Sequence, residues 1–303
     1  MKALAFDIGG TKIHGAVFDS DGKMLAERKI PTPAQSWKEG KRALIDVSRE
    51  LLSLHPDVRA CGLACAGPLH AESGMLMHPT NLNWGYTNIA LEMSQELKLQ
   101  VLLENDAAAA AMAEHWIGEF KNVEPLIAVT LGTGLGVGIV RKNQLFRGGR
   151  GLHPEGGHLI LDPNEREVYC ACGNSGCSEG FLAGSHFLAR AQKALGNSQI
   201  SIHEVLKLAK NQDVRVVSLF DQYSVHLAQF LYNYVILFYP QAIVLSGSFS
   251  KDSEYFLGKT IQKLDILLAK RIKADPEIRP RVGISKIDNP GLLGAASIVF
   301  RLK

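Results

Sequence analysis

Three of the five cysteines of this chain lie within eight residues, in the stretch CACGNSGC that begins at Cys170. The run HPEGGH precedes this stretch and ends at His158. Thiol and imidazole groups in such a cluster can bind a metal ion or carry out redox chemistry, or they can be a chance feature of a loop of small residues. A redox motif of the thioredoxin type has two residues between its cysteines, whereas Cys170 and Cys172 have one. The residues themselves leave metal binding and chance clustering open.

Two glycine-rich stretches have the composition of phosphate-binding turns. AFDIGGTKIHGAVF, from Ala5, aligns without a gap with AVTLGTGLGVGIVR, from Ala128, so that Asp7 meets Thr130. Glycine has no Cβ and permits positive φ, which lets backbone N–H groups approach a phosphate. Either stretch alone is equally well explained as an ordinary β-hairpin, but the repetition favours two turns that hold one nucleotide from both sides. Neither stretch matches a P-loop or a dinucleotide fingerprint, because a strand and not a helix follows the glycines.

A third group, Glu104-Asn105-Asp106, stands between the apolar segment VLL and the alanine-rich segment AAAAAMAEHW. Catalytic side chains of α/β proteins often follow the carboxyl ends of strands, and a carboxylate there can accept the proton of a hydroxyl group. The alternative role is a helix N-cap, which Asn105 or Asp106 can also provide.

The elements that must position these groups indicate an α/β protein with covered sheets. Strands are expected at LAFDI, KIHGAVF, CGLACAG, VLLEN, PLIAVTL and AIVLSG, and helices near residues 179–195, 213–239, 253–273 and 290–301. The length of 303 residues suits about two domains. We expect a small lobe over residues 1–118, completed by a C-terminal helix over 290–303, and a large lobe over 119–289 that contains the cysteine loop.

Composition excludes several other classes of protein. Hydrophobic residues make up 46% of the chain and charged residues 21%, and the net charge is +3, without a basic patch that would suggest nucleic acid. The uncharged segment from Tyr223 to Ser250 contains His226, Asn233 and Pro240 and is better explained as a buried helix and a strand than as a membrane span. The first residues lack the apolar core of a signal peptide. We therefore expect a cytoplasmic protein with no membrane partner, in which disulfides are disfavoured.

Four motifs taken together resemble the ROK family: DIGGT, LGTGLGVGIV, HPEGGH and CACGNSGCSE, in the family's order along the chain. The resemblance extends from Asp7 to the closing segment GLLGAASIVF. It implies the actin/hexokinase-like ATPase fold, with two lobes that each open with a β-hairpin phosphate loop. It also implies one of the family's activities, since members are bacterial sugar kinases and sugar-responsive repressors.

The resemblance also implies roles for single residues. Asp106 is implied as the catalytic base, and the implied sugar contacts are Gly67, Thr80, Asn105, Asp106, Glu155, His158 and Glu179. The implied contacts to the nucleotide and its Mg²⁺ are Asp7, Gly9, Gly10, Thr11, Lys12, Gly132, Thr133, Gly134 and Gly247. A closed structural zinc site is implied at His158, Cys170, Cys172 and Cys177. His158 is implied to bind zinc with one ring nitrogen and the sugar with the other.

The sequence thus predicts an ATP-dependent hexose kinase with ATP and catalytic Mg²⁺, a structural Zn²⁺ and a small-molecule hexose as substrate. Glucose is the first candidate, and N-acetylglucosamine, N-acetylmannosamine and fructose follow. A sugar-sensing regulator is the non-enzyme alternative; a repressor would carry an N-terminal helix-turn-helix, for which the early first strand leaves no room. No nucleic-acid partner is expected, and the chain is expected to form a homodimer.

Overall fold

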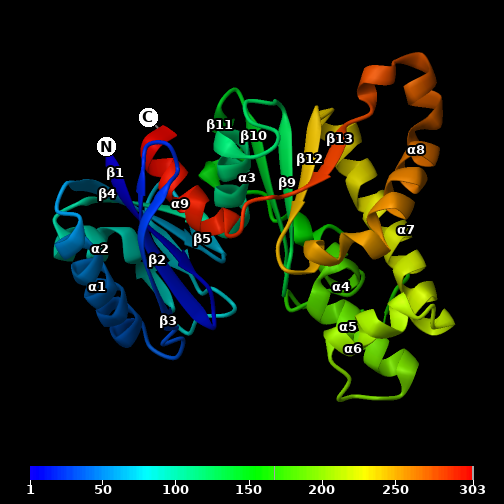
Figure 1. The fold of residues 1–303 in the computed structure, drawn as a ribbon, viewed down its shortest axis with the longest axis horizontal. Coiled ribbons are helices and arrows are strands. Elements are labelled where there is room, and N and C mark those ends of the chain that lie inside the picture. Colours follow the sequence, from blue (N-terminus) through cyan, green and yellow to red (C-terminus); the bar gives the residue numbers. More distant parts are fainter. Residues whose placement is uncertain (167, 302–303) are drawn as a thin grey trace. The chain divides into compact units, whose positions relative to one another are not determined.

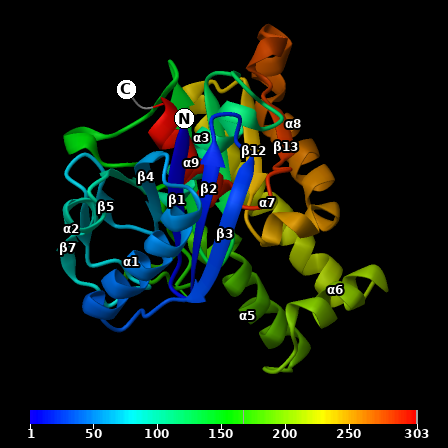
Figure 2. The same ribbon diagram turned by 60° about the vertical axis from the view of Figure 1, so that its left-hand side comes forward.

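The computed structural model, drawn in Figures 1 and 2, describes residues 1–166 and 168–301. These residues form two compact units. The first unit comprises Met1–Asn122, Gly138–Pro154 and Ser285–Lys303, and the second comprises Val123–Val137 and Glu155–Ile284. The last two positions of the helix expected over 290–303 lie outside the described residues.

The first unit is built on a five-stranded sheet with the strand order β3-β2-β1-β4-β8. Its strands are β1 (Lys2–Ile8), β2 (Lys12–Asp19), β3 (Met24–Pro31), β4 (Val58–Cys65) and β8 (Gln100–Asn105). Short turns join β1, β2 and β3, which are therefore antiparallel neighbours. Strands β4 and β8 follow helical connections and are parallel to β1 and to each other. The carboxyl ends of β1, β4 and β8 consequently meet at one edge of the sheet.

Different helices cover the two faces of this sheet, because side chains alternate along each strand. Leu4 and Phe6 of β1 belong to a hydrophobic core shared with α1 (Trp37–Leu54) and α2 (Ile89–Leu97). Ala5 belongs to the core on the opposite face, shared with α3 (Asp106–Ile117) and α9 (Pro290–Arg301), which Figure 2 shows behind β1 and β2. Small residues on this second face let α9 approach the sheet closely.

A small three-stranded sheet also belongs to the first unit. Its strands are β5 (Leu69–His70), β6 (Met75–Met77) and β7 (Tyr86–Asn88), in the order β5-β6-β7. The loop between β6 and β7 carries Thr80.

The second five-stranded sheet has the order β11-β10-β9-β12-β13, which repeats the plan of the first sheet. Its strands are β9 (Leu126–Leu131), β10 (Leu135–Arg141), β11 (Gln144–Leu145), β12 (Ala242–Ser246) and β13 (Arg281–Ile284). Strand β12 is parallel to both β9 and β13, as β4 is to β1 and β8. The α/β class and the repeated strand, glycine turn and strand are those that the sequence predicts.

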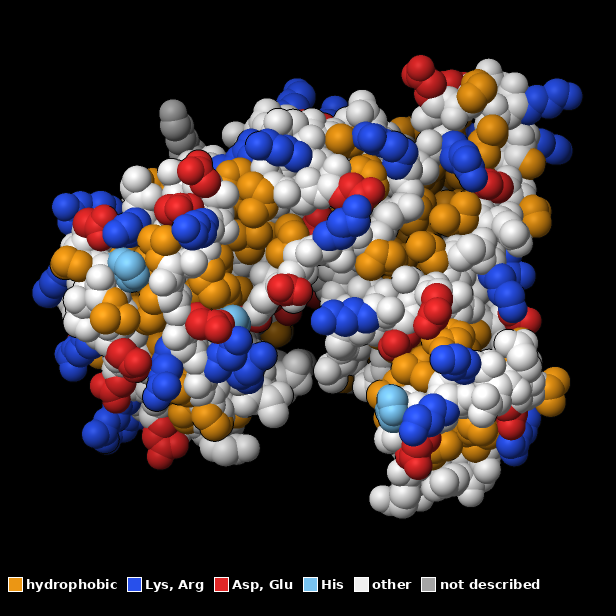
Figure 3. Space-filling model, in the orientation of Figure 1, with side chains coloured by type: hydrophobic (Ala, Val, Ile, Leu, Met, Phe, Trp, Pro, Cys, Tyr) orange, Lys and Arg blue, Asp and Glu red, His pale blue; other side chains and the backbone are white. Residues whose placement is uncertain are grey.

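The helices of the second unit are α4 (Ser178–Leu182), α5 (Gly184–Leu195), α6 (Ile202–Lys210), α7 (Val214–Phe238) and α8 (Leu257–Ala274). The uncharged segment forms most of α7, which is buried through Tyr223, Leu227 and Leu231 and packs along α8 (Figure 1). Among the described residues, no helix is long and apolar enough to cross a membrane. On the face of the molecule in Figure 3, Lys and Arg side chains are interspersed with Asp and Glu.

The prediction of a single helix over 179–195 is wrong, because the chain leaves the helical conformation at Ala183 (ψ 141°). The break has a structural reason. It allows the N–H of Gly184 to donate to the carbonyl oxygen of Gly132 at 2.8 Å, so that α5 begins against the second glycine turn.

Candidate functional site

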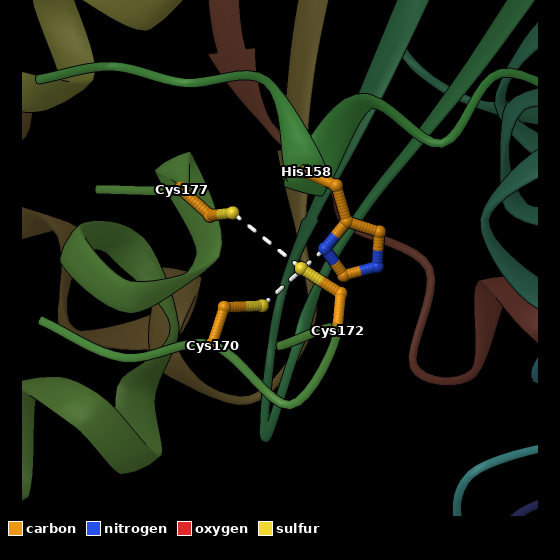
Figure 4. Close-up of side chains that lie close together, drawn as sticks. All are labelled: His158, Cys170, Cys172 and Cys177. Atoms are coloured by element: carbon orange, nitrogen blue, oxygen red, sulfur yellow. Dashed lines mark hydrogen bonds between the residues drawn. The ribbon is translucent and has the colours of Figure 1, made fainter. Parts of the chain in front are cut away.

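The cysteine cluster of the second unit brings four potential metal ligands together (Figure 4). The ligand atoms of His158, Cys170, Cys172 and Cys177 all lie within 4.8 Å of one another. Cys172 Sγ is 3.6 Å from Cys177 Sγ, and Cys170 Sγ is 3.4 Å from His158 Nδ1. Donors of a tetrahedral zinc ion lie about 2.0–2.3 Å from the metal and hence roughly 3.3–3.8 Å apart. The donor set and these two separations therefore fit zinc.

Close backbone packing places His158 beside the thiols. His158 ends a short 3₁₀ turn, Gly156–His158, next to β10. A Cβ at Gly156 would overlap the Tyr234 hydroxyl oxygen, and a Cβ at Gly157 would overlap the carbonyl oxygen of Leu135. The two glycines of HPEGGH are thus explained by close approach.

Two carboxylates connect this cluster to its surroundings. His158 turns Nδ1 toward the thiols, and its Nε2 lies 3.9 Å from a carboxylate oxygen of Glu155. Glu179 Oε1 accepts a hydrogen bond from the Cys170 thiol at 3.3 Å, and Oε2 accepts one from the backbone N–H of Leu135 at 3.0 Å. The structure therefore brings together Glu155, His158 and Glu179, the three predicted sugar contacts of the second unit.

The second glycine turn, between β9 and β10, lies directly before Leu135. Gly132 donates its N–H to the carbonyl oxygen of Gly134 at 3.0 Å, and Ser185 Oγ donates to the carbonyl oxygen of Thr133 at 2.6 Å. A Cβ at Gly132 would have no protein atom within 4 Å. The fold itself thus leaves space at this position. Gly247 immediately follows β12.

In the first unit, Asn105 and Asp106 stand where β8 ends and α3 begins. Asn105 is the N-cap: its Oδ1 accepts the N–H groups of Ala107 at 3.0 Å and Ala108 at 3.1 Å. Asp106 Oδ1 accepts the N–H of the adjacent Ala107, at 2.9 Å. Burial raises the pKa of Asp106, and the nearby carboxylate of Asp7 raises it further. A raised pKa makes a carboxylate a stronger proton acceptor. Of the two residues that the sequence offers as the N-cap of this helix, Asn105 has that role.

Sequence reasoning missed the ion pair that holds this junction. Glu104 is fully buried; its Oε1 accepts the N–H of Asn105 at 2.9 Å, and its Oε2 accepts Arg147 Nη2 at 2.5 Å. Arg147 follows β11, 43 residues away in sequence, so no local pattern pointed to it. A buried, charge-assisted pair of this kind restrains the backbone from which Asn105 and Asp106 project.

Asp7 and the first glycine turn lie at the same edge of the sheet. Asp7 Oδ2 accepts a hydrogen bond from Asn289 Nδ2 at 3.1 Å. Burial raises the pKa of Asp7, although this hydrogen bond acts in the opposite direction. Gly9 donates its N–H to the carbonyl oxygen of Lys12 at 3.0 Å and so closes the turn. The mostly buried carboxylates of Asp7 and Asp106 are the hard oxygen donors that Mg²⁺ prefers.

The remaining predicted residues of the first unit lie in loops. Gly67 stands between β4 and β5, and Thr11 and Lys12 are exposed at the first turn. Thr80 lines a hollow of about 360 Å³ together with Ala34, Gln35, Pro79, Asn81, Leu82 and Asn83. A Cβ at Gly10 would lie 2.9 Å from Asn81, so the turn packs closely against the Thr80 loop.

A model of the ROK family matches residues 3–301, nearly the whole chain. The chain belongs to the ROK family. Its α/β architecture is accordingly the actin/hexokinase-like ATPase fold, as the sequence predicts.

Relatives of this ROK protein include kinases and regulators. It is 25% identical to a glucokinase of Thermotoga maritima, with 99% of this chain and 97% of the relative covered. It is 28% identical to an N-acetyl-D-glucosamine kinase of Haemophilus influenzae, with 96% and 97% covered. It is 25% identical to the xylose repressor of Bacillus subtilis, with 98% and 77% covered.

Solved ROK structures have the same fold. A ROK hexokinase from Thermus thermophilus superposes with a TM-score of 0.85 at 29% identity, covering 98% of this chain and 97% of that one. A ROK glucokinase from Streptomyces griseus, solved with glucose and AMPPNP, superposes with a TM-score of 0.81 at 27% identity, covering 98% and 99%.

Proposed function

We propose that this ROK protein is an ATP-dependent hexose kinase, with glucose as the first candidate substrate. The environment of the Asp106 carboxylate is the observation that carries the proposal. This carboxylate has a raised pKa, stands at the carboxyl end of β8 beside a second acid, and is not the cap of α3. Phosphoryl transfer to an alcohol needs a carboxylate that accepts the hydroxyl proton, and this one is suited to do so. The kinase relatives and the glucose complex of the Streptomyces griseus enzyme support the same activity.

The other first-unit residues would orient the sugar. Both bonds that Asn105 Oδ1 accepts come from α3, so its amide nitrogen is the group available to donate to a sugar hydroxyl. Gly67 and Thr80 are proposed as further contacts. The buried Glu104–Arg147 pair would keep Asn105 and Asp106 in register with the sugar.

In the second unit, Glu155, His158 and Glu179 are the proposed sugar contacts. Zinc bound by His158 Nδ1 and the three thiolates would have four protein ligands and no open position, so it would stabilise the loop and not take part in catalysis. This arrangement leaves His158 Nε2 for a sugar hydroxyl. It also makes the orientation of His158 depend on the metal.

The nucleotide would contact both glycine turns. Gly10 and Thr11 on one turn and Thr133 and Gly134 on the other would supply backbone N–H groups to the phosphates, and Lys12 would supply an ammonium. The N–H groups of Gly9 and Gly132 close the turns, and these two glycines would let the phosphates approach the backbone. Gly247 is the proposed contact near adenosine. Asp7 would hold Mg²⁺, which when bound would neutralise charge on the transferred phosphoryl group.

The proposal is tested by coupled assay of purified protein with Mg·ATP and a panel of glucose, N-acetylglucosamine, N-acetylmannosamine and fructose. Turnover on glucose supports the first candidate, and faster turnover on another sugar identifies the alternative. Sugar binding without turnover on the panel would instead support a regulator, the role that the xylose repressor has among the relatives. The homodimer stays a prediction, which sedimentation of the purified chain would test.

Asp106→Asn gives the sharper test. Asparagine cannot accept a proton at neutral pH, so kcat should fall by roughly 10²–10⁴-fold, the range for a positioned proton acceptor. Asn105 continues to cap α3, so the variant should fold and should bind sugar in calorimetry as the wild type does. A folded Asp106→Asn variant that kept most of the wild-type kcat would rule out the base assignment.

A further inference from the structure

A chain of hydrogen bonds lies behind Asp7 in the first unit. Asn289 Nδ2 donates to Asp7 Oδ2 at 3.1 Å and lies 3.3 Å from His14 Nδ1. His14 Nε2 lies 2.7 Å from Glu27 Oε2. His14 is only 4% exposed, whereas Glu27 lies at the surface and also pairs with Lys29 at 2.9 Å. The chain therefore connects the acid of the first glycine turn to a surface ion pair.

The orientation of the Asn289 amide is determined by its other contact. Asn289 Oδ1 accepts the backbone N–H of Leu292, in the first turn of α9, at 3.1 Å. With its oxygen facing that N–H, the amide nitrogen must face Asp7 and His14. Both N–H groups of the amide then have an acceptor, which requires His14 Nδ1 to carry no proton. His14 accordingly donates from Nε2 to Glu27.

The sheet brings these groups together. Asp7 and His14 are directly opposite each other in the antiparallel β1–β2 pair, and Lys29 of β3 is opposite His14. Opposite residues of an antiparallel pair point to the same face. Asp7 and Ala5 share a face, and α9 packs on that face with Asn289 just before its first residue. The hairpin that makes the first glycine turn thus also presents Asp7 to Asn289.

We propose that Asn289 is a positioning residue that holds the Asp7 carboxylate in one orientation for the metal-bound nucleotide, and that His14 and Glu27 in turn hold Asn289. The inference rests on the role of Asp7 in the proposed function. A carboxylate binds a metal ion less well when it rotates freely. Replacing a residue that orients such a ligand typically changes metal affinity or activity by about 10–100-fold. Among the described residues, no other side chain donates a hydrogen bond to Asp7.

Asn289→Asp separates this role from simple capping of α9. Aspartate has the same shape and is as good an N-cap as asparagine, so the contact to Leu292 survives. Its second oxygen, however, places an acceptor and a negative charge against Asp7, where the amide placed a donor. We expect the Kd of Mg·AMPPNP, measured by calorimetry, to rise by about 10–100-fold. The sugar Kd should stay close to the wild-type value, whereas the melting temperature at pH 7 should fall, because two carboxylates then face each other in a buried site.

Asn289→Ser is a second variant; it keeps a capping oxygen, adds no charge, and replaces the amide nitrogen that faces Asp7 and His14 by one shorter hydroxyl group. It should weaken Mg·AMPPNP binding in the same direction. Asn88→Asp is the matched control, because Asn88 caps α2 through the same contact, with Oδ1 accepting the Leu91 N–H at 3.0 Å. This control should bind Mg·AMPPNP as the wild type does.

Equal Mg·AMPPNP affinities for the wild type, Asn289→Asp, Asn289→Ser and Asn88→Asp would overturn the proposal and leave Asn289 as a cap. A loss of affinity that is just as large for AMPPNP with EDTA would also overturn it, because the effect would not involve the metal. If the wild type bound Mg·AMPPNP but phosphorylated no sugar, the proposed kinase function would fail while the test of Asn289 remained decisive.

Discussion

The two glycine turns share a backbone plan but differ in what surrounds them. Asp7 precedes the first turn and is held by Asn289, whereas Thr130 occupies the equivalent position before the second. Thr130 Oγ1 accepts the N–H of Gly136 at 3.1 Å, so this side chain is used within its own turn. Both units therefore keep the same strand, turn and strand. The residue before the turn differs: in the first unit it is Asp7, whose carboxylate can face a metal ion, and in the second it is Thr130, whose hydroxyl stabilises the turn.

The neighbours of the glycines differ as well. A Cβ at Gly9 would lie 3.4 Å from the carbonyl oxygen of Lys12, whereas a Cβ at Gly132, the equivalent position of the second turn, would contact nothing within 4 Å. Glu179 lies beside the second turn and also contacts Cys170 of the cysteine cluster. Substitutions at equivalent positions should consequently have different effects.

The largest contrast is expected between Asp7→Asn and Thr130→Val. Asp7→Asn should lower kcat by roughly 10²–10³-fold, the range for one preorganised electrostatic group. Thr130→Val removes one hydrogen bond, worth about 1 kcal/mol, and should affect stability more than kcat. Steady-state kinetics with titrated Mg²⁺ measure both effects. Similar losses of kcat in the two variants would show that the positions are functionally equivalent.

The stability of Asp7→Asn should follow from the raised pKa of Asp7. A carboxyl group whose pKa is raised by folding favours the folded state below its unfolded pKa of about 3.9, and that contribution is lost as the pH rises through the folded pKa. At neutral pH the charged carboxylate therefore disfavours folding. We expect Asp7→Asn to melt at or above the wild-type temperature at pH 7, with the difference shrinking toward pH 4. Loss of activity in this variant would then be separate from loss of fold.

Local patterns allowed the sequence to predict the parts of the site that lie close together along the chain. The glycine turns, the cysteine cluster and the junction at Asn105 each occupy a few consecutive residues. Partners brought together by packing could not be predicted: Asn289 is 282 residues from Asp7, and Arg147 is 43 residues from Glu104. The break at Ala183 was missed for the same reason, since the hydrogen bond from Gly184 goes to Gly132 and not to a neighbour in sequence.

A smaller effect, on nucleotide binding, is expected from Gly132→Val. The backbone of Gly132 does not require glycine for its φ, and no protein atom meets the new Cβ, so the variant should fold. The added side chain would occupy space that phosphate needs, and the Kd of Mg·AMPPNP should rise by at least about tenfold, or about 1.4 kcal/mol. Sugar affinity in the absence of nucleotide should change little. Unchanged nucleotide affinity in calorimetry would contradict the two-turn arrangement.

The smallest effect on nucleotide binding is expected from Cys172→Ser, which acts only through the second turn. Elemental analysis of native protein should find about one zinc per chain, as one four-ligand site requires, and the variant should lose it. Without zinc, Cys170 and His158 lose a common partner, and the loop that leads through Cys177 into the helix carrying Glu179 is held less firmly.

Since Glu179 also accepts the Leu135 N–H, zinc loss should raise the sugar KM and disturb the second turn slightly, while the Asp7 side remains intact. The melting temperature should fall by about 2–4 °C for each kcal/mol of stability lost. Ser175→Ala, in the same loop but outside the ligand set, is the control and should retain zinc. Native protein free of zinc, or a Cys172→Ser variant that kept the metal, would show that the cluster is not a four-ligand zinc site. The geometry of the second turn would then depend on its direct contacts with Glu179, Gly184 and Ser185 and not on a metal.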